Sequence, residues 1–200
     1  MRKFIFSLAI VASVLAHASS GALAADVYVM RGLAGFLFPN VVYPLAGSLR
    51  QRGHDVEMTS YQAASRIALE ITAKKRKDPR RKIAIIGHSL GGNAVTTILQ
   101  KLATEGITID YAAVIDAPNP KPVAPAVVIV DNFYQFEGAR KPVLVAQNPR
   151  KTRINQYNFR GRRGQDGGEG TMKPKRGHLS IATDSFVTHR IMTMVDRLGR

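Results

Sequence analysis

A Gly-x-Ser-x-Gly motif at residues 87–91 supplies the chain's best candidate for a nucleophile, Ser89. The largely apolar residues 82–86 precede the motif, and a segment with helical spacing of apolar residues follows it, which is the strand–turn–helix context that this motif needs. The turn is sharp, so the glycines at its ends relieve crowding around the serine. We therefore predict an exposed, nucleophilic Ser89. The alternative is a tight turn that carries an ordinary surface serine.

A serine hydroxyl needs a base to take its proton, and the base needs an acid that fixes its tautomer. His178 is the best candidate for the base, because it follows a glycine-rich segment and precedes the last predicted helix. His54 lies in a loop before a strand, and His189 lies in the middle of a helix. His88 adjoins Ser89 in the turn and cannot approach that oxygen from the required side.

We consider three carboxylates as the acid, and all three precede His178, which fits the chain order serine, acid, histidine. Asp116 ranks first, because it ends a strand and a proline-rich loop begins directly after it. Asp131 ranks second, since it falls near the end of the next strand, and Glu137 ranks third. Each could instead be a surface carboxylate that offsets some of the positive charge.

Acyl transfer also requires two N–H donors for the oxyanion that develops on the substrate. The backbone N–H of Leu90 follows the nucleophile and is the first predicted donor. The loop after the first strand, Gly32-Leu33, should provide the second, and we assign it to the Leu33 N–H. Alternatively, residues 31–35 are only a tight turn between a strand and a helix, which the glycines make possible, and have no role in catalysis.

The first 25 residues have the pattern of a signal peptide. Arg2 and Lys3 precede an apolar run at residues 4–16, and Ala22-Leu23-Ala24-Ala25 is a small-residue cleavage site. We expect a mature chain that starts near Asp26 and is secreted or periplasmic, with an uncleaved anchor as the weaker alternative. No later stretch is long enough to cross a bilayer.

The composition limits the possible partners. The chain has 200 residues and no cysteine, which excludes disulfides, thiol catalysis and cysteine-bound metal. Its formal charge is +15, or +13 without Arg2 and Lys3, and much of it lies at residues 74–82 and 150–176. Such a charge favours an anionic surface or substrate, although a solvated face explains it equally well. We do not expect nucleic acid as a partner, because the sequence contains no nucleic-acid-binding motif.

Periodicity predicts alternating strands and helices within one domain, residues 26–200. The predicted strands are 27–30, 56–58, 82–86, 111–115 and 126–130, the last with an alternative end at 136; 143–146 is a sixth candidate, and 153–159 is irregular or strand-like. The predicted helices span about 40–52, 63–77 and 94–103, and a last helix follows Asp184. This order predicts an α/β fold with a mostly parallel sheet and helices on both faces. Residues 161–177 are predicted to be a loop.

The motifs together resemble the α/β-hydrolase superfamily and, within it, the small lipases and esterases. The resemblance is carried by residues 29–35, 87–92, 114–118 and 177–179, and Gly-His-Ser-Leu-Gly-Gly at 87–92 is its most specific part. It implies a single-domain α/β-hydrolase fold and Asp116 as the acid, as in the pancreatic-type lipases. In other members the acid lies one strand later, which keeps Asp131 open.

Two departures from that resemblance bear on the substrate. Arg31-Gly32 stands where many lipases have His-Gly, and the short, proline-rich segment 116–126 leaves no room for a helical lid. The first departure bears on the support of the oxyanion loop, and the second favours soluble or short-chain esters. The leading hypothesis is an exported serine hydrolase of carboxylic esters, acting on a small-molecule or lipid ester, which needs no metal or organic cofactor. A thioesterase or phospholipase with the same triad, or a non-catalytic binding protein of the same fold, is the alternative.

Overall fold

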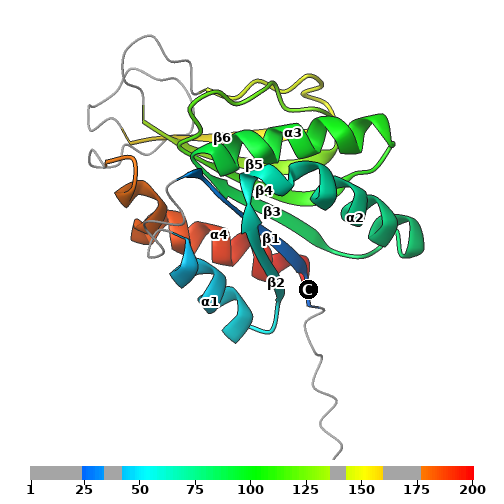
Figure 1. Ribbon diagram of the computed structural model, residues 1–200, viewed down its shortest axis with the longest axis horizontal. Helices are drawn as coiled ribbons and strands as arrows, with labels where there is room; N and C mark the ends of the chain where they lie inside the picture. Colours follow the sequence, from blue (N-terminus) through cyan, green and yellow to red (C-terminus); the bar gives the residue numbers. More distant parts are fainter. Residues whose placement is uncertain (1–23, 34–41, 136–142, 160–176) are drawn as a thin grey trace, which may run out of the picture.

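Six parallel strands form one sheet in the order β2-β1-β3-β4-β5-β6. The computed structural model describes residues 24–33, 42–135, 143–159 and 177–200 (Figure 1), so all but the last two residues of the predicted signal peptide lie outside it. The strands are β1 (Asp26–Arg31), β2 (Asp55–Ser60), β3 (Ile83–His88), β4 (Ile109–Ile115), β5 (Val127–Tyr134) and β6 (Arg153–Asn158).

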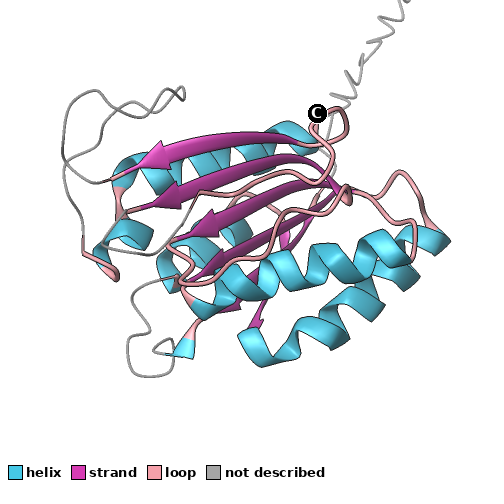
Figure 2. Ribbon diagram, turned by 90° about the horizontal axis from the view of Figure 1, so that it is seen from above, coloured by secondary structure: helices cyan, strands magenta, loops and turns pink. Residues whose placement is uncertain are grey.

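Four α-helices cover the two faces of the sheet, α2 and α3 on one and α1 and α4 on the other (Figures 1 and 2). They are α1 (Tyr43–Gln51), α2 (Ala64–Lys77), α3 (Leu90–Thr104) and α4 (Ser185–Leu198). Two 3₁₀ turns, η3 (Tyr61–Ala63) and η4 (Ser180–Thr183), precede α2 and α4. The predicted parallel sheet with helices on both faces, in a single domain, is therefore confirmed.

Strand periodicity explains why both faces need cover. Side chains alternate along a strand, so Tyr28 and Met30 pack towards α2 and α3, whereas Val27 and Val29 pack towards α1 and α4. All four are buried. Strands covered on both sides are apolar along their length, which is what β1, β3 and β4 show.

The order of the strands reverses direction between β1 and β3. The chain leaves β1, forms β2 on one side of it, and then returns to form β3 on the other side. In an open parallel sheet, the loops at the carboxyl ends of the strands diverge at such a point and leave a crevice between them. The loop that begins at Gly32 follows β1 and Ser89 follows β3, so both lie at this crevice.

The last strand of the sheet is formed by a different segment from the one predicted. Residues 143–146 form only an isolated bridge, Val123 with Ala146, so the prediction of a strand there is wrong. The segment 153–159, predicted as irregular or strand-like, contains the regular edge strand β6. In the described ranges no helix is long and apolar enough to span a bilayer.

Candidate active site

Ser89 lies in a strained turn between β3 and α3. Its backbone has φ 57° and ψ −126°, a combination that residues other than glycine rarely adopt. The Ser89 N–H donates to the Ile115 carbonyl (2.9 Å), which ties the turn to the end of β4. A Cβ on Gly87 would lie 2.2 Å from the Gly91 oxygen, and one on Gly91 would lie 2.0 Å from the Met30 oxygen. Glycine is therefore required at both positions.

The structure brings His178 between Ser89 and Asp116, although the three residues come from separate parts of the chain. The His178 Nε2 atom lies 2.9 Å from Ser89 Oγ, and its Nδ1 atom lies 2.7 Å from Asp116 Oδ2. A carboxylate only accepts hydrogen bonds, so Nδ1 carries the proton and Nε2 is free to accept one from the serine hydroxyl. This is the arrangement in which a histidine can deprotonate a serine.

Asp116 occupies the turn that ends β4. Its φ is 44°, and its N–H donates to the Phe133 carbonyl (2.7 Å), so the backbone is held against the end of β5. The carboxylate, which is largely buried, accepts the backbone N–H of Gln135 (3.3 Å) and the side-chain N–H of the same residue (3.0 Å). Gln135 was not among the predicted site residues, because nothing in the sequence shows that the end of β5 faces Asp116.

His88 is a second residue that the sequence did not place in the site. It is buried, its Nε2–H donates to the His178 carbonyl (2.8 Å), and the two ring centroids are 4.8 Å apart. Burial lowers the pKa of His88, and the hydrogen bond to the carbonyl only partly opposes this. A neutral His88 therefore holds the backbone of His178 through this hydrogen bond.

Leu90 and Leu33, whose N–H groups are the predicted oxyanion donors, each adjoin a residue at the Ser89 turn. Leu90 is the first residue of α3, where backbone N–H groups have no partner within the helix. Gly32 presses on the serine, because a Cβ there would lie 2.8 Å from Ser89 Cβ and 3.2 Å from Ser89 Oγ. The exposed Leu33 follows directly. Leu90 therefore adjoins Ser89, and the residue before Leu33 packs against it, while the donor roles of both N–H groups remain predictions.

Of the two other candidate acids, the structure describes only Asp131, which does not join this group. Asp131 is fully buried within β5, and its carboxylate contacts Tyr111, Asn155 and Arg190 rather than a histidine. Glu137 lies outside the described residues. His189 is exposed on α4.

The structure describes only part of the basic segment at residues 150–176. Because β6 runs parallel to β5, Arg150, Lys151 and Arg153 lie at the amino ends of the strands, at the edge opposite Ser89. Residues 160–176 lie outside the described part. Any attraction of anionic substrates by the cluster at 150–153 would therefore act far from the predicted catalytic residues.

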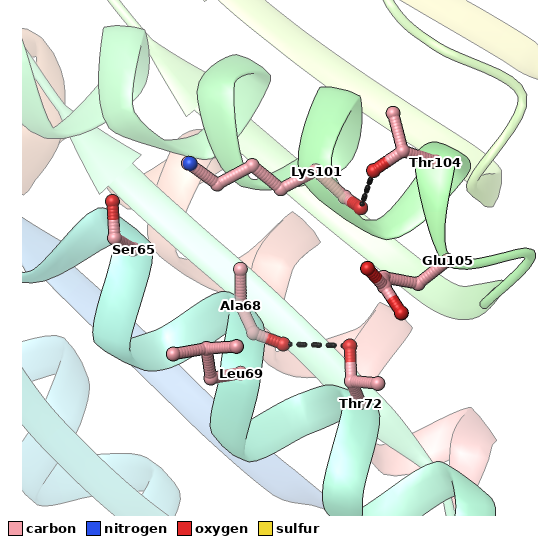
Figure 3. Close-up of a pocket in the computed structure, with 7 residues that line it drawn as sticks. All are labelled: Ser65, Ala68, Leu69, Thr72, Lys101, Thr104 and Glu105. Carbon is pink, nitrogen blue, oxygen red and sulfur yellow. Dashed lines mark hydrogen bonds between the residues drawn. The ribbon is translucent and has the colours of Figure 1, made fainter.

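A pocket between α2 and α3 offers no second reaction centre (Figure 3). It is lined by Ser65, Ala68, Leu69, Thr72, Lys101, Thr104 and Glu105. The Thr72 and Thr104 hydroxyls donate to carbonyls of their own helices. Lys101 lies twelve residues after Ser89, which is about 18 Å along the helix axis. Among the described residues there is also no group of three side chains suited to hold a metal ion.

One family model matches part of the chain. The model of a family described as "Putative serine esterase (DUF676)" matches residues 39–120, which include the Ser89 turn and Asp116. No curated protein sequence matches the chain.

Solved structures with similar backbones include three hydrolases. A protein from Xanthomonas campestris described as a "putative hydrolase of the alpha/beta superfamily" is 11% identical and has a TM-score of 0.49, with 87% of this chain and 97% of that chain covered. Human thioesterase 2 is 12% identical and has a TM-score of 0.49, with 88% and 96% covered. An acetyl xylan esterase is 13% identical and has a TM-score of 0.44, with 89% and 99% covered.

Proposed function

We propose that this chain, which has the α/β-hydrolase fold, is an exported serine hydrolase that cleaves carboxylic esters. The match to the serine-esterase family supports hydrolase activity in general. The observation that carries the proposal is the position of His178, with Nε2 2.9 Å from Ser89 Oγ and Nδ1 2.7 Å from Asp116 Oδ2. Export rests on the signal-peptide pattern at residues 1–25.

In the proposed reaction, Ser89 Oγ attacks the acyl carbon of the ester while His178 Nε2 takes the hydroxyl proton. The tetrahedral oxyanion receives hydrogen bonds from the backbone N–H groups of Leu33 and Leu90. His178 then returns the proton to the leaving alcohol, and an acyl group remains on Ser89. Water, deprotonated by His178, attacks this acyl-enzyme and releases the acid.

Asp116 holds His178 in the reactive tautomer and stabilises the imidazolium that forms in each half of the reaction. Two positioning contacts support this arrangement. Gln135 orients the Asp116 carboxylate through two hydrogen bonds, and His88 holds the backbone of His178. Hydrogen bonds of this kind keep reacting groups within the narrow range of geometry that catalysis needs.

The segment after Asp116 bears on the choice of ester. Residues 116–126 form no helix and are held against α3 by Gln100, whose side-chain N–H donates to the Pro122 carbonyl (2.7 Å). Val123 N–H and Gln147 N–H pair this segment with residues 145–147. A segment tied down in this way is unsuited to open and close as a lid. We therefore propose soluble or short-chain esters as the substrates.

The test combines probe labelling with kinetics. A fluorophosphonate probe should label the wild type, and hydrolysis of p-nitrophenyl esters should be fastest for short acyl chains. Ser89→Ala should abolish labelling and lower kcat by about 10⁴-fold or more. Ser65→Ala, at an exposed serine on α2, is the matched control and should change neither. An unreactive Ser89 would instead favour a non-catalytic binding protein, and faster turnover of acyl thioesters would favour a thioesterase.

A further inference from the structure

A second histidine–aspartate pair lies at the edge of the sheet opposite Ser89, where β1 begins. His54 precedes β2, and Asp196 lies in the last turns of α4. Figures 1 and 2 show the end of α4 and the C-terminus next to the start of β1. Ala25, the residue before β1, completes this group, which we call the N-terminal socket (Ala25, His54 and Asp196).

Hydrogen bonds connect the three residues of the socket in series. The Ala25 backbone N–H donates to His54 Nδ1 (3.3 Å), and His54 Nε2 lies 3.0 Å from Asp196 Oδ1. Because Nδ1 accepts a hydrogen bond, the imidazole proton is on Nε2 and is donated to the carboxylate. Arg52 Nη1 holds the other carboxylate oxygen at 2.6 Å. The buried His54 therefore links the backbone nitrogen of Ala25 to a carboxylate.

Ala25 belongs to the folded domain, whereas Ala24 does not. The Ala25 side chain has an exposed fraction of 0% and packs in the core cluster that contains Leu49, Val56 and Val195. Its carbonyl accepts the Asp55 N–H (3.1 Å), which adds one residue to the pairing of β1 with β2. Ala24 is exposed. The boundary of the fold thus lies between residues 24 and 25, one residue before the boundary that the sequence predicted.

We propose that the Ala24–Ala25 peptide bond is the processing site of the exported chain and that the new α-amino group of Ala25 is bound in the N-terminal socket. The sequence suits this bond, because Ala22 and Ala24 are then the small residues at the third and first positions before the cleavage. An export signal peptidase supplies the catalysis. Hydrolysis consumes one water, breaks the bond from the Ala24 carbonyl carbon to the Ala25 nitrogen, and leaves a carboxylate on Ala24 and an ammonium on Ala25.

The socket is suited to the charge that this cleavage creates. A buried ammonium is costly unless it is paired and hydrogen-bonded. The nitrogen that donates to His54 is the nitrogen that becomes the ammonium, and Asp196 lies one imidazole away to balance its charge. Cleavage one residue later would remove a fully buried side chain and leave His54 Nδ1 without its donor.

Intact-mass measurement on the full-length chain, expressed with export and recovered outside the cytoplasm, tests the processing site. A mature chain that begins at Ala25 is the expected result. A chain that begins at Asp26 or elsewhere overturns the inference but leaves the proposed export intact, whereas an uncleaved, unexported chain overturns both. Ala24→Leu, which places a large residue directly before the bond, should block cleavage there.

Reductive methylation of the α-amino group in the native mature protein tests the socket. The wild-type group should react slowly, and His54→Ala should raise its rate about tenfold or more. His54→Asn, whose side-chain oxygen replaces the Nδ1 acceptor, should keep part of the protection and serves if His54→Ala does not fold. His189→Ala, at an exposed histidine of α4, should leave the rate unchanged. Equal rates in the wild type and both His54 variants would overturn the socket, and fluorophosphonate labelling of Ser89 reports independently on the proposed esterase.

Discussion

Two buried aspartates on neighbouring strands have opposite surroundings. Asp116 ends β4, and Asp131 lies within β5 beside Ala113, three residues earlier in the register. The Asp131 carboxylate binds the guanidinium of Arg190 (2.8 Å) and accepts hydrogen bonds from Tyr111 (3.0 Å) and Asn155 (2.6 Å). Among the described residues, the groups that donate to Asp116 are His178 and the two N–H groups of Gln135, none of which carries a permanent charge.

This difference determines what each carboxylate can do. The charge of Asp131 is already balanced by Arg190, so it has little left to stabilise a second cation. The charge of Asp116 is oriented by neutral donors, so it acts fully on the imidazolium that forms when His178 accepts the serine proton. Asp116, at the carboxyl end of its strand, thus remains available for catalysis. Asp131, in the middle of its strand, instead forms an ion pair with Arg190 of α4.

The largest expected effect separates the two aspartates by activity. Asp116→Asn should lower kcat by about 10³- to 10⁴-fold, because an amide cannot stabilise the reactive tautomer or the imidazolium. Asp131→Asn should retain activity within about threefold in the fraction that remains folded. Steady-state kinetics on a short-chain ester, with circular dichroism as the folding control, checks both. The reverse pattern would transfer the role of the acid to Asp131.

The Ser89 turn and Asp116 were predictable because their signals are local. A strand, a glycine-bounded turn and a helix succeed one another within about twenty residues, and Asp116 stands directly at the end of an apolar strand. The contacts of His88 and Gln135 join residues 90 and 19 positions apart, respectively. Such contacts depend on how the elements pack, and no short sequence pattern encodes them.

The same reasoning explains why β6 was less evident than residues 143–146. The segment 143–146 is apolar and looked like a strand, whereas β6 (Arg153–Asn158) is polar. The pairing of β6 with β5 uses polar side chains, since Asn132 donates to Gln156 (2.8 Å) and Asn155 donates to Asp131 (2.6 Å). Hydrophobic periodicity cannot detect a strand whose pairing with its neighbour uses polar side chains. The neutralisation of Asp131 was equally hidden, because Arg190 lies 59 residues further along the chain.

A second, smaller effect concerns stability at the Asp131 centre. Arg190→Met should cost about 3 kcal/mol of unfolding free energy, because it leaves a fully buried carboxylate without its cation. Tyr111 does not compensate, since burial and the nearby Asp131 raise its pKa and keep it a neutral donor. Combining Arg190→Met with Asp131→Asn should recover about 1 kcal/mol or more. Urea unfolding at a constant m-value measures this cycle, and strictly additive losses would show that the pair is not coupled.

The smallest effect should appear at His88, which holds the backbone of His178, the partner of Asp116. His88→Leu removes the donor to the His178 carbonyl and should lower kcat about tenfold with KM unchanged, while His88→Gln can still donate and should restore most of the rate. The pKa of folded His88 lies below its usual value because the ring is buried, so the unfolded chain binds a proton at this residue at higher pH than the folded chain does. Unfolding free energy should therefore fall more steeply between pH 7 and 5 in the wild type than in His88→Gln, because the variant lacks this linkage. His189→Gln, at an exposed site, should reproduce the wild-type slope. If the His88→Gln slope matched the wild type as well, His88 would titrate freely and could not be the fixed neutral donor that holds His178.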